Sequence, residues 1–138
     1  MTSSAKRPAL TDGEYARLLR FRTELRRFDA WSRSEATRFG LTSAQHQLLL
    51  AVRGHGGAEP PTIGELAEYL LVRHHSVVEL VDRTAELGFV SRVHDTHDHR
   101  VVRVRLTARG RSTVRALSQV HLTELQRLAP LFERLTAD

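Results

Sequence analysis

The sequence predicts a mainly α-helical protein of the α+β class with one small β-hairpin. In most of the chain, apolar residues recur every three to four positions, which is the period of an amphipathic helix. Only around residues 89–106 does the period shorten to two, which is the period of a strand. A chain of 138 residues has the length of one domain.

A long first helix is predicted over residues 11–38. Thr11 provides an N-terminal cap, and neither glycine nor proline occurs in this range after Gly13. The apolar positions of the helix are three and four residues apart: Leu18, Phe21, Leu25 and Phe28. Glycine then ends the pattern, and a second helix is predicted over 43–53, before a loop rich in glycine and proline.

Two short helices joined by a tight turn follow this loop. Thr62 and Glu65 have the spacing of a capping box, in which each side chain accepts a hydrogen bond from a backbone N–H group of the first turn. This predicts a helix over 62–70. The apolar period resumes three residues later and predicts a second helix over 74–87, which Gly88 ends. Together the two helices form a helix-turn-helix.

A β-hairpin is predicted directly after these helices. Residues 89–94 form its first strand, and in its second strand, 102–106, valine and leucine alternate with arginine. The polar turn 95–100 joins the two strands. A hairpin in this position is a wing, so the predicted architecture is a winged helix-turn-helix between long terminal helices.

The second long helix is predicted from Thr107 to residue 136. Pro130 predicts a bend or break in this helix, because proline removes a backbone donor and crowds the preceding turn. The two long helices carry more apolar surface than one small winged-helix core can cover. We therefore expect them to pack on each other and against a partner subunit.

Positive charge is concentrated in one segment of the chain. Lysine and arginine number 21 against 16 acidic residues, and all but one of the 21 are arginine. Residues 88–115 contain seven arginines and two aspartates, whereas the remaining 110 residues contain 14 residues of each sign. A concentrated basic segment suggests a polyanionic partner, and the planar fork of arginine suits phosphate and guanine edges. The alternative is an ordinary solvated surface.

The composition argues against several other classes of protein. Cysteine is absent, which excludes disulfides and thiolate metal sites. The N-terminus does not resemble a secretory signal and no run of 18 apolar residues occurs, so we expect a soluble cytoplasmic protein without membrane contact. No glycine-rich phosphate loop or metalloprotease histidine pair is present. We therefore predict no enzyme, no catalytic residues and no cofactor.

Histidine and aspartate crowd into the predicted hairpin turn, which is a composition typical of metal sites. The residues are His94, Asp95, His97, Asp98 and His99. A hairpin tip sends neighbouring side chains in different directions, whereas a metal needs three or four converging ligands. We interpret the segment as part of the wing and predict no metal site; the alternative is a metal-responsive wing.

Three blocks of the sequence together resemble the MarR family, the multiple antibiotic resistance regulators. The blocks, which run in the order and spacing of the family, are LTSAQHQLLLAV, TIGELAEYLLVRHHSVVELVDRTAELGFVSR and DTHDHRVVRVRLTARG. They cover about half of the chain. The resemblance implies one MarR-like domain over 1–138, with a winged-helix DNA-binding lobe over 42–106 and dimerisation helices over 11–38 and 107–136.

By this resemblance we expect a homodimeric transcription regulator, usually a repressor, that binds a pseudopalindromic double-stranded DNA operator. Members of the family often release the operator on binding a small aromatic or phenolic molecule. The alternative is a protein-interaction module whose basic wing binds an acidic protein.

The predicted DNA contacts lie on the exposed face of the 74–87 helix and on the wing, because the start of a recognition helix meets base edges. They are Arg73, His74, His75, Ser76, Glu79, Arg83, His97, His99, Arg100 and Arg103. The family's wing motif, an aspartate followed by two arginines, falls on Asp98, His99 and Arg100. Histidine replaces the first arginine here, which puts the usual ion pair within the wing in doubt. Arg100 remains the residue expected to reach the minor groove.

A ligand pocket is implied between the terminal helices and the winged-helix lobe. The residues expected to line it are Phe28, Trp31, Arg38 and His46, with His121 as a further candidate. Ordinary packing is the alternative for each of them, because aromatic residues at helical spacing are common in cores.

Overall fold

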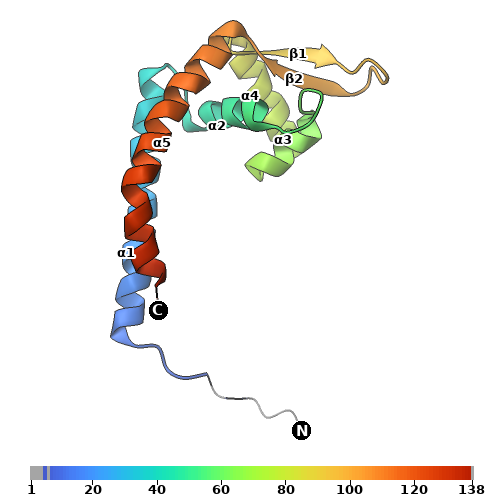
Figure 1. Cartoon of the computed structure of the whole chain (residues 1–138). Helices are drawn as coiled ribbons and strands as arrows, with labels where there is room; N and C mark the ends of the chain where they lie inside the picture. Colours follow the sequence, from blue (N-terminus) through green and yellow to red (C-terminus); the bar gives the residue numbers. More distant parts are fainter. Residues whose placement is uncertain (1–4, 6, 138) are drawn as a thin grey trace.

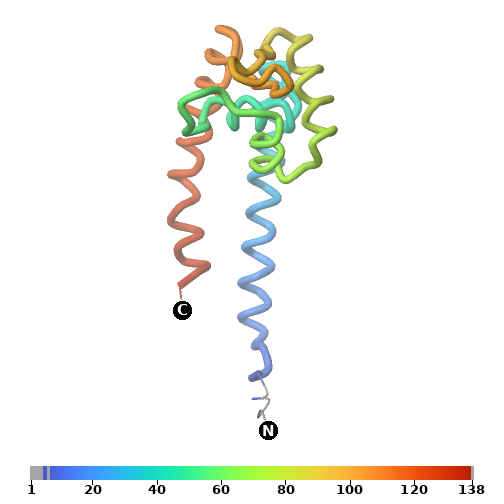
Figure 2. The backbone as a smooth tube through the Cα atoms, turned by 90° about the vertical axis from the view of Figure 1, so that its right-hand side faces the viewer, coloured from blue at the N-terminus to red at the C-terminus, as the bar shows by residue number. Residues whose placement is uncertain are grey.

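A computed structural model describes residue 5 and residues 7–137 of the chain. The described part contains seven elements in the order α1 (Asp12–Arg38), α2 (Ser43–Gly54), α3 (Ile63–Leu70), α4 (His74–Glu86), β1 (Val90–His94), β2 (Val102–Leu106) and α5 (Ala108–Thr136). Helices α2, α3 and α4 gather with the hairpin into a lobe, and α1 and α5 form an arm that extends from it (Figure 1). Seen from the side, α1 and α5 run alongside each other away from the lobe (Figure 2).

Threonine caps set the starts of four helices. Thr11, Thr42 and Thr62 each accept a hydrogen bond of 3.1 Å from the N–H group three residues later, and the side chain of that residue accepts a bond in return. Thr107 accepts the equivalent bond from Gly110 at the start of α5, also at 3.1 Å. These caps satisfy N–H groups that have no partner within the helix. The predicted capping box at Thr62 is confirmed.

The hydrophobic core lies in the lobe, and the parts of α1 and α5 next to the lobe contribute to it. Its largest fully buried apolar side chains come from five elements and the loop before β1: Leu48, Leu49, Leu66, Val77, Val81, Phe89, Val104, Val114 and Leu117. The two strands pair antiparallel, with Val90 opposite Leu106 and His94 opposite Val102. The N–H group of Val104 also donates a 2.9 Å hydrogen bond to the Pro61 carbonyl, which ties the loop before α3 to the hairpin.

Helix α5 continues through Pro130 to Thr136, so of the predicted bend or break, the break does not occur. Contacts with the N-terminal helix hold the segment after the proline. The Phe132 ring packs edge-on against Phe21 at 5.5 Å between ring centroids, and Arg17 donates a 2.9 Å hydrogen bond to the carbonyl of Ala137. A proline removes one helical hydrogen bond, and these tertiary contacts offset that loss.

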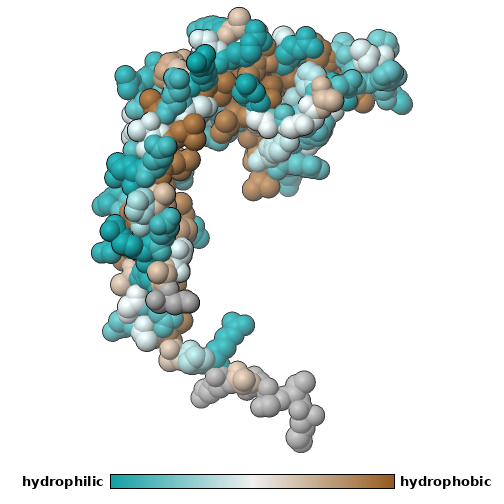
Figure 3. Space-filling model, viewed as in Figure 1, coloured by the Kyte–Doolittle hydropathy of each residue, from teal (hydrophilic) through white to brown (hydrophobic). Residues whose placement is uncertain are grey.

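Apolar side chains remain exposed on both helices of the arm. The larger ones are Tyr15, Leu18, Leu19, Val120, Leu122 and Leu125. Figure 3 shows hydrophobic surface on the inner side of the angle between the arm and the lobe. Within the described residues, none of the helices is both long enough and apolar enough to span a bilayer.

Candidate nucleic-acid interface

Helix α4 presents most of the predicted DNA contacts on one outward face. Val77, Val81 and Thr84 are buried in the lobe, which turns the opposite face of the helix toward solvent. The predicted residues at the start and along this face are exposed, except for Ser76, which is half-buried: Arg73, His74, His75, Ser76, Glu79 and Arg83. Amphipathic periodicity therefore leaves the residues within α4 on its solvent-exposed side, and Arg73 lies at the N-cap.

The N-terminus of α4 differs from those of the other four helices. Arg73 occupies the cap position and makes no side-chain hydrogen bond to the first turn. The first N–H groups of α4 are therefore not blocked by a threonine cap. A helix N-terminus with free N–H groups attracts anions, because the groups carry partial positive charge and point outward.

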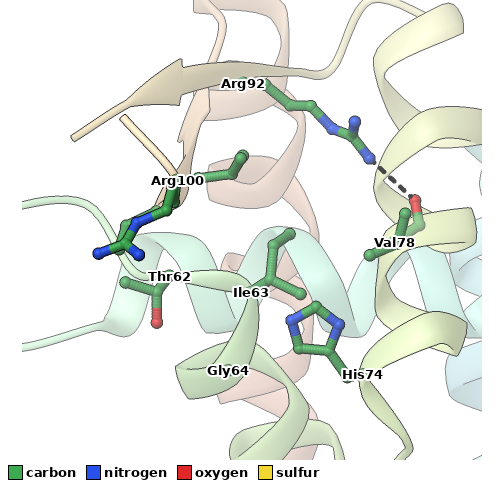
Figure 4. A pocket seen from close by; sticks show the side chains of 9 residues that line it. Thr62, Ile63, Gly64, His74, Val78, Arg92 and Arg100 are labelled. Carbon is green, nitrogen blue, oxygen red and sulfur yellow. Dashed lines mark hydrogen bonds between the residues drawn. The ribbon is translucent and has the colours of Figure 1, made fainter. Parts of the chain in front are cut away.

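A groove of about 420 Å³ separates the start of α4 from the hairpin (Figure 4). Arg92 and Arg100 lie on its hairpin side, and His74 and Val78 lie on its α4 side. The first residues of α3 complete the lining between them: Thr62, Ile63 and Gly64. A groove with two arginines on one side and a helix N-terminus on the other fits a polyanionic backbone lying along it.

An ion pair fixes the position of the hairpin relative to α4. The Arg92 guanidinium lies 2.6 Å from the Asp82 carboxylate and donates a 3.3 Å hydrogen bond to the Val78 carbonyl (Figure 4). Asp82 therefore pairs with the hairpin and not with its neighbour Arg83, and its negative charge on the exposed face of α4 is compensated. Arg92 was not among the predicted contact residues, and its only signal in the sequence was its place in the basic segment.

Arg103 is held inside the base of the wing, which corrects its prediction as a DNA contact. Its guanidinium lies 2.8 Å from Asp95 and 3.0 Å from Glu59, and it donates a 2.8 Å hydrogen bond to the Pro60 carbonyl. Only 20% of the Arg103 side chain is exposed. The hydrogen bond from Arg103 is the main cause that lowers the pKa of Asp95 to about 2, helped by the N–H groups of Asp98 and His97. Arg103 thus joins the wing to the loop before α3.

The wing also contains an ion pair between Asp98 and Arg100. The Arg100 Nε and Nη2 atoms lie 3.1 and 3.2 Å from the two carboxylate oxygens, and the pKa of Asp98 is lowered mainly by these bonds. The histidine at position 99 therefore does not abolish pairing within the wing. The Arg100 side chain is nevertheless 91% exposed, so its guanidinium can also reach a partner.

The histidines of the wing do not gather around one point. His94 Nδ1 lies 3.1 Å from the carbonyl of His99, and their ring centroids are 6.5 Å apart, while His97 is exposed nearby. Across residue 5 and residues 7–137, no group of three or more histidine, aspartate or glutamate side chains is placed to hold a metal ion. The hairpin tip separates the side chains that lie close together in the sequence.

Three of the predicted ligand-pocket residues meet around His121 of α5. The Trp31 and His46 rings lie 4.7 and 4.8 Å from the His121 ring between centroids, and Phe28 lies at 6.0 Å. Ser32, which was not predicted, is buried and lies 2.7 Å from His121 Nε2 through its Oγ atom. Its position four residues after Phe28 on the same helix face was the available signal. We call Phe28, Trp31, Ser32, His46 and His121 the aromatic cluster.

Arg38 lies outside the aromatic cluster, which corrects its prediction as a lining residue. Its side chain is 73% exposed and forms a 3.3 Å ion pair with Glu35 one helical turn earlier. At the end of α1 the arginine points to solvent, because the buried face of the helix there is occupied by Ala36.

Replacing His46 with leucine is expected to reduce the acid sensitivity of the fold. Burial, with the nearby charge of His121, lowers the pKa of His46 from 6.5 to about 4, and its Nδ1 atom is buried without a partner in the described part of the chain. Between pH 6.5 and about 4, His46 binds a proton in the unfolded chain but not in the folded chain. The free energy of unfolding of the wild type therefore falls by roughly 2 to 3 kcal/mol as the pH drops through this range.

Urea unfolding at pH 7 and pH 4.5 measures this difference. The leucine variant should lose less stability than the wild type on acidification, and a variant of the exposed His97 to leucine should behave as the wild type. Equal losses in the wild type and the His46 variant would contradict the burial of neutral His46.

The comparisons with known proteins agree with one another. A family model described as MarR family matches residues 39–101. The HTH-type transcriptional repressor MdtR of Bacillus subtilis (strain 168) is 32% identical over 71 residues, which are 51% of this chain and 44% of that protein. The chain therefore aligns with less than half the length of this relative.

Solved structures share the fold. The MarR family transcription regulator SP03579 superposes with a TM-score of 0.74 at 22% identity, covering 86% of this chain and 77% of that one. The Staphylococcus aureus MepR–DNA complex superposes with a TM-score of 0.72 at 20% identity, covering 89% and 85%. These likenesses confirm the predicted winged-helix fold with long terminal helices.

Proposed function

Because residues 39–101 belong to the MarR family and the described chain has the fold of solved MarR regulators, we propose that the protein is a homodimeric, cytoplasmic transcription regulator that binds double-stranded DNA. The observation that supports this most directly is the groove between α4 and the wing. It combines an exposed helix face, an uncapped helix N-terminus and an arginine that is 91% exposed. One surface thus offers groups for base edges and groups for phosphates.

The two parts of this surface have different proposed roles. Helix α4 enters the major groove, where His74, His75 and Ser76 meet base edges or phosphates and Glu79 accepts a hydrogen bond from cytosine. Arg73 and Arg83 bind the flanking backbone. In the wing, Arg100 reaches the minor groove and the two exposed histidines contact phosphate: His97 and His99. The related structure of MepR with DNA supports binding by a protein of this fold.

The exposed apolar side chains of the arm support a homodimer. Leu18 and Leu19 of α1 are 58% and 66% exposed, and Leu122 and Leu125 of α5 are 61% and 49% exposed. Exposed apolar surface of this kind marks a site of contact with another protein (Figure 3). A second copy that packs its own arm here would place two α4 helices on one side of the dimer, which suits a pseudopalindromic operator.

We further propose that the protein is a repressor that a small aromatic or phenolic ligand releases from DNA. The relative MdtR is named as a repressor, which supports the direction of regulation. The aromatic cluster supports the ligand class, because its rings can stack on an aromatic molecule and the His46 Nδ1 atom can bond a hydroxyl group. The ligand acts by favouring a dimer whose α4 helices no longer match the spacing of the operator.

A selection from a random pool of duplex DNA tests the proposed function. At about 150 mM salt, where nonspecific electrostatic binding is weak, the purified protein should enrich a two-fold symmetric site with half-sites about one helical turn apart. A variant with alanine at both His75 and Ser76, on the outward side of α4, should enrich no such site. If the folded wild-type dimer enriches nothing, the protein is either a DNA binder that requires a ligand or a metal or a protein-interaction module.

A further inference from the structure

The positive charge of residues 88–115 is divided between two parts of the lobe. Each of the hairpin arginines near the proposed DNA surface has a carboxylate partner: Arg92, Arg100 and Arg103. Arg109 lies 4.3 Å above the Phe89 ring and donates a hydrogen bond to the Leu87 carbonyl. Three arginines of the segment remain: Arg105, Arg111 and Arg115.

These remaining arginines gather at the base of the wing with one arginine from α2. Arg105 of β2, Arg111 and Arg115 of α5 and Arg53 of α2 are all exposed, and Arg111 donates one hydrogen bond of 3.1 Å to the Leu106 carbonyl. None of the four lies within 4.0 Å of a carboxylate oxygen in the part of the chain that the structure describes. Like charges that share a surface without counter-charges repel one another, so the fold bears an electrostatic cost there.

The four arginines surround two adjoining hollows. Arg53, Arg105 and Arg111 line one of about 330 Å³, and Arg53, Arg111 and Arg115 line one of about 530 Å³. Ser118 and Gln119 add polar groups to the larger hollow. Apolar side chains complete the lining of both hollows: the buried Val104 and Val114 are among them, and so is the exposed Leu122, which also belongs to the apolar surface of the arm. We call this surface the arginine hollow. It shares no lining residue with the groove between α4 and the wing.

The chemistry of the arginine hollow suits a phosphate group better than a carboxylate. A carboxylate presents two oxygens in one plane and is satisfied by one guanidinium fork. A phosphate presents oxygens in tetrahedral directions and can accept hydrogen bonds from several forks at once. In the larger hollow the forks come from two elements, α2 and α5, and this hollow has the volume of a small-molecule site.

We propose that the arginine hollow is a binding site for a small phosphate-bearing molecule with two or more negative charges. Arg53, Arg111 and Arg115 bind its phosphate oxygens, while Ser118 and Gln119 bond its remaining polar groups. The neighbouring apolar side chains accommodate the carbon skeleton of the molecule. Binding at this surface does not depend on the DNA-binding function proposed above.

Sodium pyrophosphate is the probe that tests this site, with DNA absent. Calorimetric titration and thermal unfolding are carried out against sodium chloride at matched ionic strength. Wild-type protein should bind pyrophosphate saturably, with a rise in Tm of roughly 5 °C. The variant Arg53→Gln/Arg115→Gln should fold as the wild type does in chloride, since both side chains are exposed, and should bind pyrophosphate at least tenfold more weakly.

Two further variants locate the binding. Arg100→Gln removes a cation from the groove beside α4, and Arg26→Gln removes an exposed cation from the arm; both should bind pyrophosphate as the wild type does. Wild-type affinity in the Arg53→Gln/Arg115→Gln variant would overturn the proposal, and so would a loss confined to Arg100→Gln. An absence of pyrophosphate binding, with a changed oligomeric state of the double variant, would instead make the arginine hollow an interface between copies of the chain.

Discussion

Replacing Gly110 with alanine is expected to lower Tm by roughly 10 °C or more. Gly110 lies in the first turn of α5 and is buried against the segment that leads into β1. A methyl group at this position would overlap the carbonyl oxygen of Phe89 and lie 3.4 Å from a Leu106 methyl group. Inserting atoms into such a tight contact costs about 3 kcal/mol or more when the neighbour cannot move.

The neighbouring backbone cannot easily yield at Gly110. The N–H group of Thr107 donates a 3.0 Å hydrogen bond to the same Phe89 carbonyl, and the Thr107 hydroxyl donates a 2.7 Å bond to the Gly88 carbonyl. These bonds draw the start of α5 against the hairpin. An added side chain must therefore break them or displace α5, which carries the arm.

Gly54→Ala provides the matched control for this prediction. Gly54 is the last residue of α2, and a methyl group there would meet nothing within 4 Å. Alanine favours a helix over glycine by up to about 1 kcal/mol, so this variant should be as stable as the wild type or more stable. Thermal and urea unfolding of both variants measure the difference. Similar stabilities of the two variants would show that α5 does not approach Phe89 this closely.

Replacing Arg100 with alanine is expected to weaken operator binding about tenfold and to reduce its salt dependence. The Arg100 guanidinium is 91% exposed at the wing, where a phosphate or the minor groove can reach it. In a dimer the change removes one cationic contact from each half-site. The slope of log affinity against log salt should therefore become shallower by about two.

Arg103→Ala should also weaken binding but leave this slope unchanged. The Arg103 guanidinium already binds Asp95, Glu59 and the Pro60 carbonyl, so its donors are not available to a phosphate. Its removal leaves two carboxylates without their shared cation and frees the wing from the loop before α3. Arg103 is thus a positioning residue for the wing, and its loss lowers affinity without removing a phosphate contact.

Fluorescence anisotropy with the selected operator, from 50 to 200 mM salt, separates the two arginines. Arg134→Ala, which changes an exposed arginine at the far end of α5, serves as the control and should match the wild type in affinity and slope. A shallower slope for Arg103→Ala would return Arg103 to the DNA contacts. An unchanged affinity for Arg100→Ala would remove the wing from the proposed interface.

Local sequence determined the elements of this fold and their order. Helix starts depend on a threonine and the residue three positions later, so pairs such as Thr62 and Glu65 could be recognised without a structure. The helical period also identified the outward face of α4, because burying Val77 and Val81 leaves only one orientation for the helix. The exposed residues at its start followed directly from that orientation.

Tertiary structure alone decided which charged groups are free. Arg100 and Arg103 are three residues apart in the basic segment, yet one is exposed and the other is bonded to the Pro60 carbonyl, 43 residues earlier in the chain. Arg53 of α2 lies beside Arg111 and Arg115 of α5 only because the fold brings these two helices together. An ion pair depends on the distance between side chains in space, and local periodicity carries no information about partners on distant elements. The helices and strands of this protein could therefore be predicted from its sequence. The distribution of its positive charge over two surfaces depends on the tertiary structure and could not.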